Sequence, residues 1–331
     1  MTIDPDNNNL TRRQFMARAA KAGVSIAAAG AAGFWFHDTR GPGPATENES
    51  NIRLPDFSIP DLKPQMSIIH GADRKETLRL ALKSIGGMER YIKKGDRVLL
   101  KVNAAFASPQ MLSATTHPQV VFEITRLCLD AGASAVIISD NPINDPGSCF
   151  TLSGITDAAR SAGARLVLPR DDAFKPFSVP GGRLIRNWPI LYEPLRGINK
   201  VIGTAPIKDH HRSGASMIMK NWYGLLGGRR NIFHQDIQTI ITELAMMIRP
   251  TLVILDGTTT MMTNGPTGGS LADLKETHTM IAGTDQVAVD AFGATLLQRS
   301  VNDLPFIGMA EAAGLGTANY KSLNPEFGIV D

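Results

Sequence analysis

Three neighbouring segments indicate the fold class: RVLLKVN at 97–103, PQVVFEITRLCLDA at 118–131 and SAVIISDN at 134–141. The first and third segments contain short apolar runs rich in Val, Ile and Leu, which are typical of buried strands. Between them, apolar residues recur at helical spacing, with Pro118 near the first turn and Gly132 after the end. We therefore predict a strand, a helix and a second strand in succession.

The same alternation continues along the chain. Further apolar runs predict strands, and further segments with helical spacing predict helices. The predicted strands lie at 165–168, 200–204, 251–255 and 278–282, and the predicted helices at 151–162, 236–248 and 286–298. Regular alternation of this kind favours an α/β fold with a mostly parallel sheet, or sheets, flanked by helices.

Two strands end in a similar way, one at Asp140 and the other at Asp256, each followed by a turn. This repetition favours two Rossmann-like lobes, at 67–195 and 196–331. The alternative is that the two endings are unrelated, because any parallel strand can end in Asp.

The N-terminus carries the features of an export signal over residues 1–33. Thr11-Arg12-Arg13-Gln14-Phe15-Met16 precedes a run rich in Ala and Gly. A basic start, a weakly apolar middle and small residues near the end are typical of such signals. The paired arginines resemble the twin-arginine motif, which is read by a receptor. An amphipathic N-terminal helix is the alternative, but no charge occurs between Lys21 and Asp38.

This signal predicts the twin-arginine translocation machinery as a partner and a periplasmic or cell-envelope location. An uncleaved anchor is a second alternative, although the apolar segment 22–36 is shorter than the ~20 residues that a membrane-spanning helix needs. Residues 34–66 are rich in Pro, Gly, Asn and acidic groups, so we predict a linker and an extended lead-in.

Composition excludes several classes of protein. The 331 residues are 43% hydrophobic and 20% charged, which is typical of a globular protein. A net charge of +3 gives no general attraction to nucleic acid, and we expect no nucleic-acid partner. The two cysteines, Cys128 and Cys149, cannot supply the four thiolates of a conventional iron–sulfur cluster. We therefore expect no such cluster.

Polar side chains follow the predicted strands, and ligands of open parallel sheets bind beyond the carboxyl ends of the strands. We expect these residues to meet at one edge of the sheet: Lys101, Asn103, Asp140, Lys208, His211 and Asp256. A lysine at such a position either lies in solvent or binds an anion, or acts as a base if burial lowers its pKa.

Three loops carry further candidates. Lys220-Asn221 precedes Gly227-Gly228-Arg229-Arg230, where glycines and arginines together could wrap an anion, although a basic surface loop is the alternative. His117, in Thr115-Thr116-His117-Pro118, is either an acid–base group or part of an ordinary helix cap. Gly265-Pro266-Thr267-Gly268-Gly269 is a candidate lid or a plain turn.

Taken in order, these motifs resemble the domain-of-unknown-function 362 (DUF362) family over residues 67–300. They are Lys101-Val102-Asn103, Thr115 to Pro118, Asp140, Lys208 with His211, Lys220-Asn221, Asp256, Gly265-Pro266 and Val287-Ala288-Val289-Asp290-Ala291. The resemblance implies an α/β fold and marks these positions, but the family has no established general activity. Some similar proteins carry a ferredoxin-like cysteine segment, which this chain lacks.

Two functions fit these observations. The first is an exported enzyme acting on a small anionic substrate; the alternative is a periplasmic ligand- or cofactor-binding protein without turnover. For the enzyme, the candidate catalytic residues are His117, His211 and Asp256, and the candidate substrate ligands are Lys101, Asn103, Lys208, Lys220, Asn221 and Arg229. A divalent metal is the candidate cofactor, with Asp140, His234 and Asp290 as candidate ligands.

Overall fold

The computed structural model describes residues 12–13, 16, 18, 21 and 51–330. The chain divides into two compact units, 1–43 and 44–331. In the first unit, the described residues are helical and exposed. The remainder of the predicted signal, its cleavage region and the alternative anchor lie outside the described residues, as do residues 34–50 of the predicted linker.

One sheet forms the centre of the second unit, with strand order β11-β1-β10-β9-β7-β2-β3-β4 and with β8 paired to β7. Its central strands β4, β3, β2, β7 and β9 are parallel, whereas β10 runs antiparallel to both β9 and β1. The predicted α/β class with a mostly parallel sheet is confirmed. The bounds are β1 Met66–His70, β2 Arg97–Lys101, β3 Ala135–Ser139, β4 Arg165–Leu166, β7 Lys200–His210, β8 Gly214–Ser216, β9 Leu252–Met261, β10 Leu274–Gly283 and β11 Glu326–Ile329.

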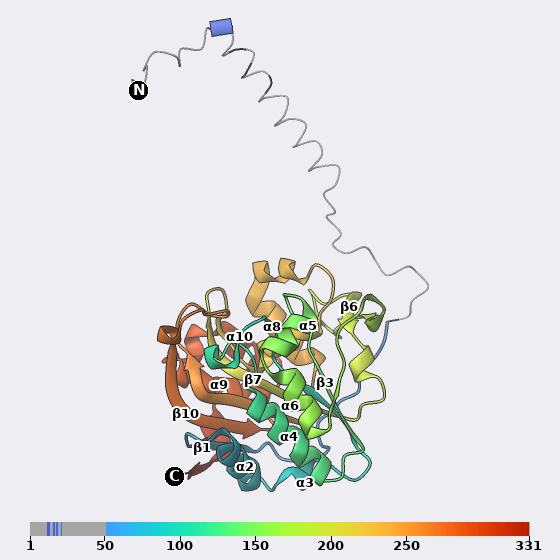
Figure 1. The fold of residues 1–331 in the computed structure, drawn as a ribbon, viewed down its shortest axis with the longest axis vertical. Helices are drawn as coiled ribbons and strands as arrows, with labels where there is room; N and C mark the ends of the chain where they lie inside the picture. Colours follow the sequence, from blue (N-terminus) through green and yellow to red (C-terminus); the bar gives the residue numbers. More distant parts are fainter. Residues whose placement is uncertain (1–11, 14–15, 17, 19–20, 22–50, 331) are drawn as a thin grey trace. The chain divides into compact units, whose positions relative to one another are not determined.

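Helices cover both faces of this sheet (Figure 1). Because side chains alternate along a strand, Leu99 packs into the core on one face while Val98 and Leu100 pack into the core on the other. The second face is covered by α2 Arg74–Ser84, α3 Met88–Tyr91, α4 Pro118–Asp130, α5 Pro146–Leu152 and α6 Ile155–Ala162; the first by α7 Ile218–Asn221, α8 Ile237–Met247, α9 Gln286–Leu296 and α10 Pro305–Ala312.

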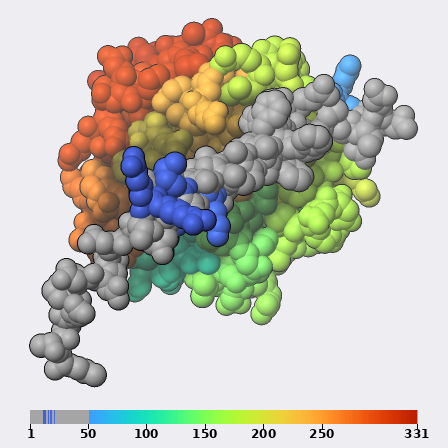
Figure 2. Space-filling model, turned by 90° about the horizontal axis from the view of Figure 1, so that it is seen from above, coloured from blue at the N-terminus to red at the C-terminus, as the bar shows by residue number. Residues whose placement is uncertain are grey.

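The sheet differs from the predicted division into two lobes. Strand β2, from the first predicted lobe, pairs in parallel with β7 from the second, starting with Val98 opposite Lys200. Strand β1 lies between β10 and β11, at the other end of the same sheet. Figure 2 shows segments from the middle and from the end of the chain making one continuous surface. The predicted boundary at 195/196 therefore falls inside one sheet.

Three predicted strands, β7, β9 and β10, are longer than expected, and one predicted helix is broken. Strand β7 continues to His210 because it turns back through Gly214 to pair with β8, and β9 continues to Met261 against β10. The helix predicted at 151–162 is instead α5 followed by α6, separated at Gly154, which has a φ of 77°. The longer strands place Lys208 and Asp256 within strands rather than beyond their ends.

The described part of the predicted lead-in, 51–66, belongs to the second unit and packs within it. Ile52 forms a bridge to Phe177, in the small sheet of β5 Phe174–Phe177 and β6 Trp188–Leu191. Phe57 is buried in the core, and its backbone N–H donates to the carbonyl of Arg249. No helix within the described residues is both long enough and apolar enough to span a bilayer.

Candidate functional site

A cavity of about 450 Å³ lies beyond the carboxyl ends of β2 and β3 and beside the end of β7. It brings together many of the predicted residues, which come from distant parts of the sequence. The predicted residues that line it are Asn103, Asp140, Lys208, His211, Lys220, Asn221, His234 and, from the predicted loop, Gly265, Pro266 and Thr267. Phe106, His210, Tyr223, Gly224, Arg230 and Asn264 line it as well.

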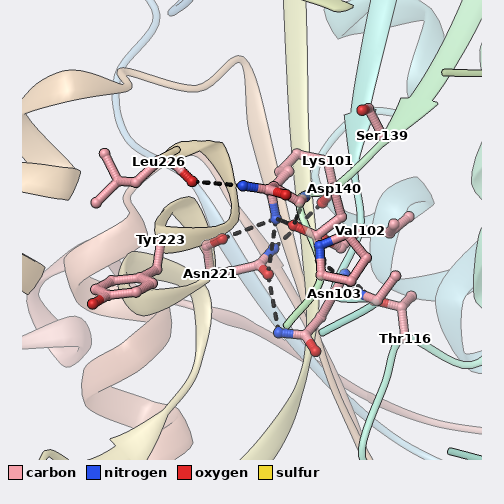
Figure 3. Close-up of polar contacts among 12 residues, drawn as sticks. Lys101, Val102, Asn103, Thr116, Ser139, Asp140, Asn221, Tyr223 and Leu226 are labelled. Atoms are coloured by element: carbon pink, nitrogen blue, oxygen red, sulfur yellow. Dashed lines mark hydrogen bonds and ion pairs between the residues drawn. The ribbon is translucent and has the colours of Figure 1, made fainter. Parts of the chain in front are cut away.

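A buried ion pair forms the base of the site. Lys101 Nζ lies 2.7 Å from Asp140 Oδ1, and both residues are almost fully buried. The same ammonium donates to the carbonyls of Val102 and Asn221 at 2.7 and 2.9 Å. Burial lowers the pKa of Lys101, and the charge of Asp140 opposes that shift. With its donors used in these contacts (Figure 3), Lys101 supports the cavity instead of lining it.

Two asparagine side chains connect this pair to a second lysine. Asn221 Oδ1 accepts from Lys101 Nζ at 3.2 Å and from Asn103 Nδ2 at 3.1 Å, and its Nδ2 donates to the Thr204 carbonyl. Asn103 Oδ1 in turn accepts from Lys208 Nζ at 3.3 Å. Because both amides are engaged in this way, Asn103 and Asn221 position the lysines of the site.

Lys208 is nearly inaccessible to solvent. Its ammonium donates to the Ala114 carbonyl at 2.5 Å and lies 5.3 Å from the centroid of the Phe106 ring. Burial, followed by the charge of Lys220, lowers the pKa of Lys208 to about 7. Lys208 can therefore be either charged or neutral near pH 7.

Lys220 is the cation that is available to a ligand. Its Nζ lies 5.2 Å from the centroid of the Tyr223 ring, and within residues 51–330 it has no hydrogen-bond or ion-pair partner. Burial, with a further contribution from the charge of Arg230, lowers the pKa of Lys220 to about 8. A buried ammonium without a counter-ion is unfavourable, and an anion in the cavity would relieve that cost.

Arg230, rather than the predicted Arg229, contributes to the cavity. Arg229 is exposed, whereas Arg230 is buried and donates to the carbonyls of Tyr223, Leu226, Asn141 and Pro142. No carboxylate pairs with this guanidinium among the described residues. Asp140 is the single carboxylate among the described residues that line the cavity, so the lining carries an excess of positive charge.

Three imidazoles, His210, His211 and His234, form what we call the histidine stack. The rings of His210 and His211 are 5.0 Å apart and inclined by 8°, and those of His210 and His234 are 6.0 Å apart and inclined by 15°. His210 Nδ1 accepts from the backbone N–H groups of Arg212 and Ser213. Burial lowers the pKa of His210 to about 2, so this ring is neutral and carries its proton on Nε2.

A hydrogen-bond chain assigns the tautomer of His234. The Tyr223 hydroxyl donates to the Arg230 carbonyl, and it lies 3.1 Å from His234 Nδ1. Since that hydroxyl proton is already used, Nδ1 carries the imidazole proton and Nε2 keeps its lone pair. Burial also lowers the pKa of His234. A neutral base thus lies in the lining of a positively charged cavity.

Two of the three predicted catalytic residues lie elsewhere. Asp256 is on the face of β9 that α2 covers, where its Oδ2 is 3.2 Å from Arg74 Nε. His117 caps α4, with its Nδ1 accepting from the Gln119 N–H at 3.3 Å. Burial and the charge of Arg74 lower the pKa of His117 to about 4, opposed by Asp256. Neither residue lines the cavity, so the structure does not bring His117 and Asp256 together with His211.

Asp290 has a structural contact instead of a place in the cavity. Its two carboxylate oxygens accept from the N–H groups of Ile218 and Met219, at 2.9 and 3.0 Å, and so hold the start of α7. Burial raises the pKa of Asp290 to about 7. In the described part of the chain, no three or more His, Cys, Asp or Glu side chains are placed to bind a metal ion. The candidate ligands Asp140, His234 and Asp290 therefore form no metal site there.

The loop at 264–267 lines the cavity and is held at its start by two carboxylates. Asp273 Oδ1 accepts from Thr263 Oγ1 at 2.8 Å and from Asn264 Nδ2 at 2.6 Å. Asp209 Oδ2 accepts from the Gly265 N–H at 3.3 Å. This part of the loop is therefore fixed to the body of the protein as a wall of the cavity.

Gly224 is required by the site for a steric reason. A Cβ at this position would lie 1.7 Å from Asp140 Oδ1 and 2.8 Å from Lys101 Nζ. Neither Gly224 nor Tyr223 stood out in the sequence. Gly224 acts through Asp140 and Lys101, which are distant along the chain, and the contacts of Tyr223 with Arg230 and His234 depend on how the intervening loop folds. The adjacent pair Arg229-Arg230 did stand out, but only the fold shows which arginine faces inward.

This chain is similar to several known proteins. A thylakoid-associated protein of Synechocystis sp. is 27% identical over 247 residues, which cover 72% of this chain and 74% of that protein. Among solved structures, the lactate racemase apoprotein of Thermoanaerobacterium thermosaccharolyticum is 13% identical with a TM-score of 0.39, over 74% of this chain and 61% of that one. A crystal structure of a Thermotoga maritima protein is 10% identical with a TM-score of 0.37, over 73% of this chain and 60% of that one.

These two structures are distant, and the chain spans about 60% of the length of each. Residues 98–295 match the family described as domain of unknown function (DUF362), which is more than half of the chain. The chain belongs to the DUF362 family.

Proposed function

We propose that this protein binds a small organic anion in the cavity, with Lys220 as the group that contacts the negative charge. The observation that carries the proposal is the ammonium of Lys220, which is buried and has no polar partner within residues 51–330. The one carboxylate of the lining, Asp140, is already paired with Lys101. A ligand carboxylate or phosphate would supply the missing counter-charge.

The test is calorimetric titration of the full chain with small carboxylates and phosphate esters, combined with thermal unfolding. We expect saturable binding that Lys220→Gln weakens at least tenfold. Lys83→Gln, at an exposed position on α2, is the matched control and leaves binding unchanged. Equal affinities in the wild type and Lys220→Gln would refute the proposal.

Acid–base turnover of the bound anion is a second candidate function. It is favoured by Lys208, whose pKa is about 7, and by His234, a cavity-lining imidazole whose pKa is lowered by burial. General acid–base groups work best when their pKa lies near the operating pH. These two residues replace His117 and Asp256 as candidates for proton transfer. Recovery of every bound anion unchanged after long incubation would leave ligand binding as the function.

We also propose export by the twin-arginine route, supported by the order Arg12-Arg13-Gln14-Phe15 before an apolar run. The test is cell fractionation with mass spectrometry of the exported chain. Replacement of both Arg12 and Arg13 by Lys should leave the chain in the cytoplasm, whereas Arg18→Lys should not. Export of the double variant at the wild-type level would refute this route.

A further inference from the structure

We infer that the anion taken by this cavity carries a flat aromatic ring, which stacks along the histidine stack while its charged group contacts Lys220. This inference rests on the proposed function and adds the chemical class of the ligand. It follows from the size of the cavity, from a continuous aromatic wall and from the alignment of the rings in that wall.

The cavity is too large for a simple inorganic anion. Its volume of about 450 Å³ is in the range of pockets that hold a complete organic ligand. Acetate or phosphate alone would leave most of that space to water. The charged group that Lys220 contacts must therefore belong to a larger organic molecule.

An aromatic wall leads from the buried lysine to the surface. The Tyr223 ring lies 5.2 Å from Lys220 Nζ and 5.2 Å from the centroid of the His234 ring. The wall continues through His210 to His211, which is exposed. A ligand whose charge lies at Lys220 would therefore extend along ring faces and edges.

The histidine stack is arranged to accept a further ring. The ring planes of His211 and His234 are each within 15° of the plane of His210, and aromatic rings prefer offset stacking at centroid distances of about 4.5 to 7 Å. His210 and His234 are held neutral by burial, so they offer aromatic surface without adding charge. Phe106, above the Lys208 ammonium, adds another ring to the lining.

The test compares benzoate with cyclohexanecarboxylate, which has the same charge and a similar size but is not flat, and with acetate. We expect benzoate to bind at least tenfold more tightly than either. His211→Leu should weaken benzoate about three- to tenfold, the range that aromatic stacking supplies, and should leave the affinity for acetate unchanged. His278→Leu, which alters a histidine outside the lining, is the matched control.

Equal binding of benzoate and cyclohexanecarboxylate would overturn the ring inference and leave the proposed anion site standing. The same conclusion follows if His211→Leu weakens all three anions equally. If none of the three anions binds, the proposed function fails together with the inference.

Discussion

Gly224→Ala tests how the buried pair of Lys101 and Asp140 supports the site. The added methyl would lie 1.7 Å from Asp140 Oδ1 and 2.9 Å from its Cγ, so the carboxylate or the backbone must move by more than 1 Å. Asp140 is also held by the Ala104 N–H at 2.6 Å and by the Asn141 N–H at 3.0 Å. Little room remains for a movement that keeps these contacts.

The size of the effect follows from which contact is lost. If Asp140 moves, Lys101 becomes a buried charge without its counter-ion, and breaking such a pair costs about 3–5 kcal/mol. If the backbone of residues 222–225 moves instead, Asn221 and Tyr223 are displaced from their partners. We expect the free energy of unfolding to fall by about 3–5 kcal/mol and anion binding to be lost.

The assay is urea unfolding followed by tryptophan fluorescence, with anion binding measured on the folded variant. Gly308→Ala, in α10, is the matched control, because no atom lies within 4 Å of its added methyl. That control should gain about 0.5–1 kcal/mol, the usual difference between Gly and Ala inside a helix. A loss below 1 kcal/mol in Gly224→Ala, with binding intact, would refute the reasoning.

Three further predictions follow from other contacts. Asp290→Ala leaves the buried N–H groups of Ile218 and Met219 without acceptors, so the free energy of unfolding in urea should fall by about 2–5 kcal/mol. A fall below about 1 kcal/mol would argue against this role of Asp290 at the start of α7. Because the pKa of Lys220 is about 8 in the folded protein and 10.5 in an ordinary lysine, the unfolded chain binds more protons between these limits, and stability should rise from pH 8 to pH 10. This rise should shrink in Lys220→Gln, and an identical slope would contradict the assignment. Anion affinity should fall above pH 8, by up to tenfold per pH unit once Lys220 is neutral, and calorimetry showing constant affinity to pH 10 would contradict the contact.

Apolar patterning was sufficient to predict the α/β class and the strands that carry Lys101 and Asp140. Residues directly after short buried strands share one edge of the sheet, which is why Asn103 and Asp140 meet in the cavity. The pattern could not show that β7 and β9 continue past their apolar runs, since those extensions depend on pairing with β8 and β10. It therefore placed Asp256 at the end of a strand, whereas this residue lies within β9.

Other parts of the site depend on side-chain direction, which only tertiary packing decides. Arg229 and Arg230 are equivalent in the sequence. Arg230 is the buried one, because its guanidinium donates to four backbone carbonyls. The division into two lobes differed for a related reason. The strands β2 and β7 are separated by about a hundred residues, and the local apolar pattern of each strand does not show which other strand it pairs with.

Contact between Lys220 and the anion can be observed directly in a crystal structure with 4-bromobenzoate, in which anomalous scattering locates the bromine and so fixes the direction of the ligand. We expect a bromine peak inside the cavity and a carboxylate oxygen about 2.7–2.9 Å from Lys220 Nζ, with the peak lost in Lys220→Gln. A peak outside the cavity, or one retained at full occupancy in that variant, would show that Lys220 does not hold the anion.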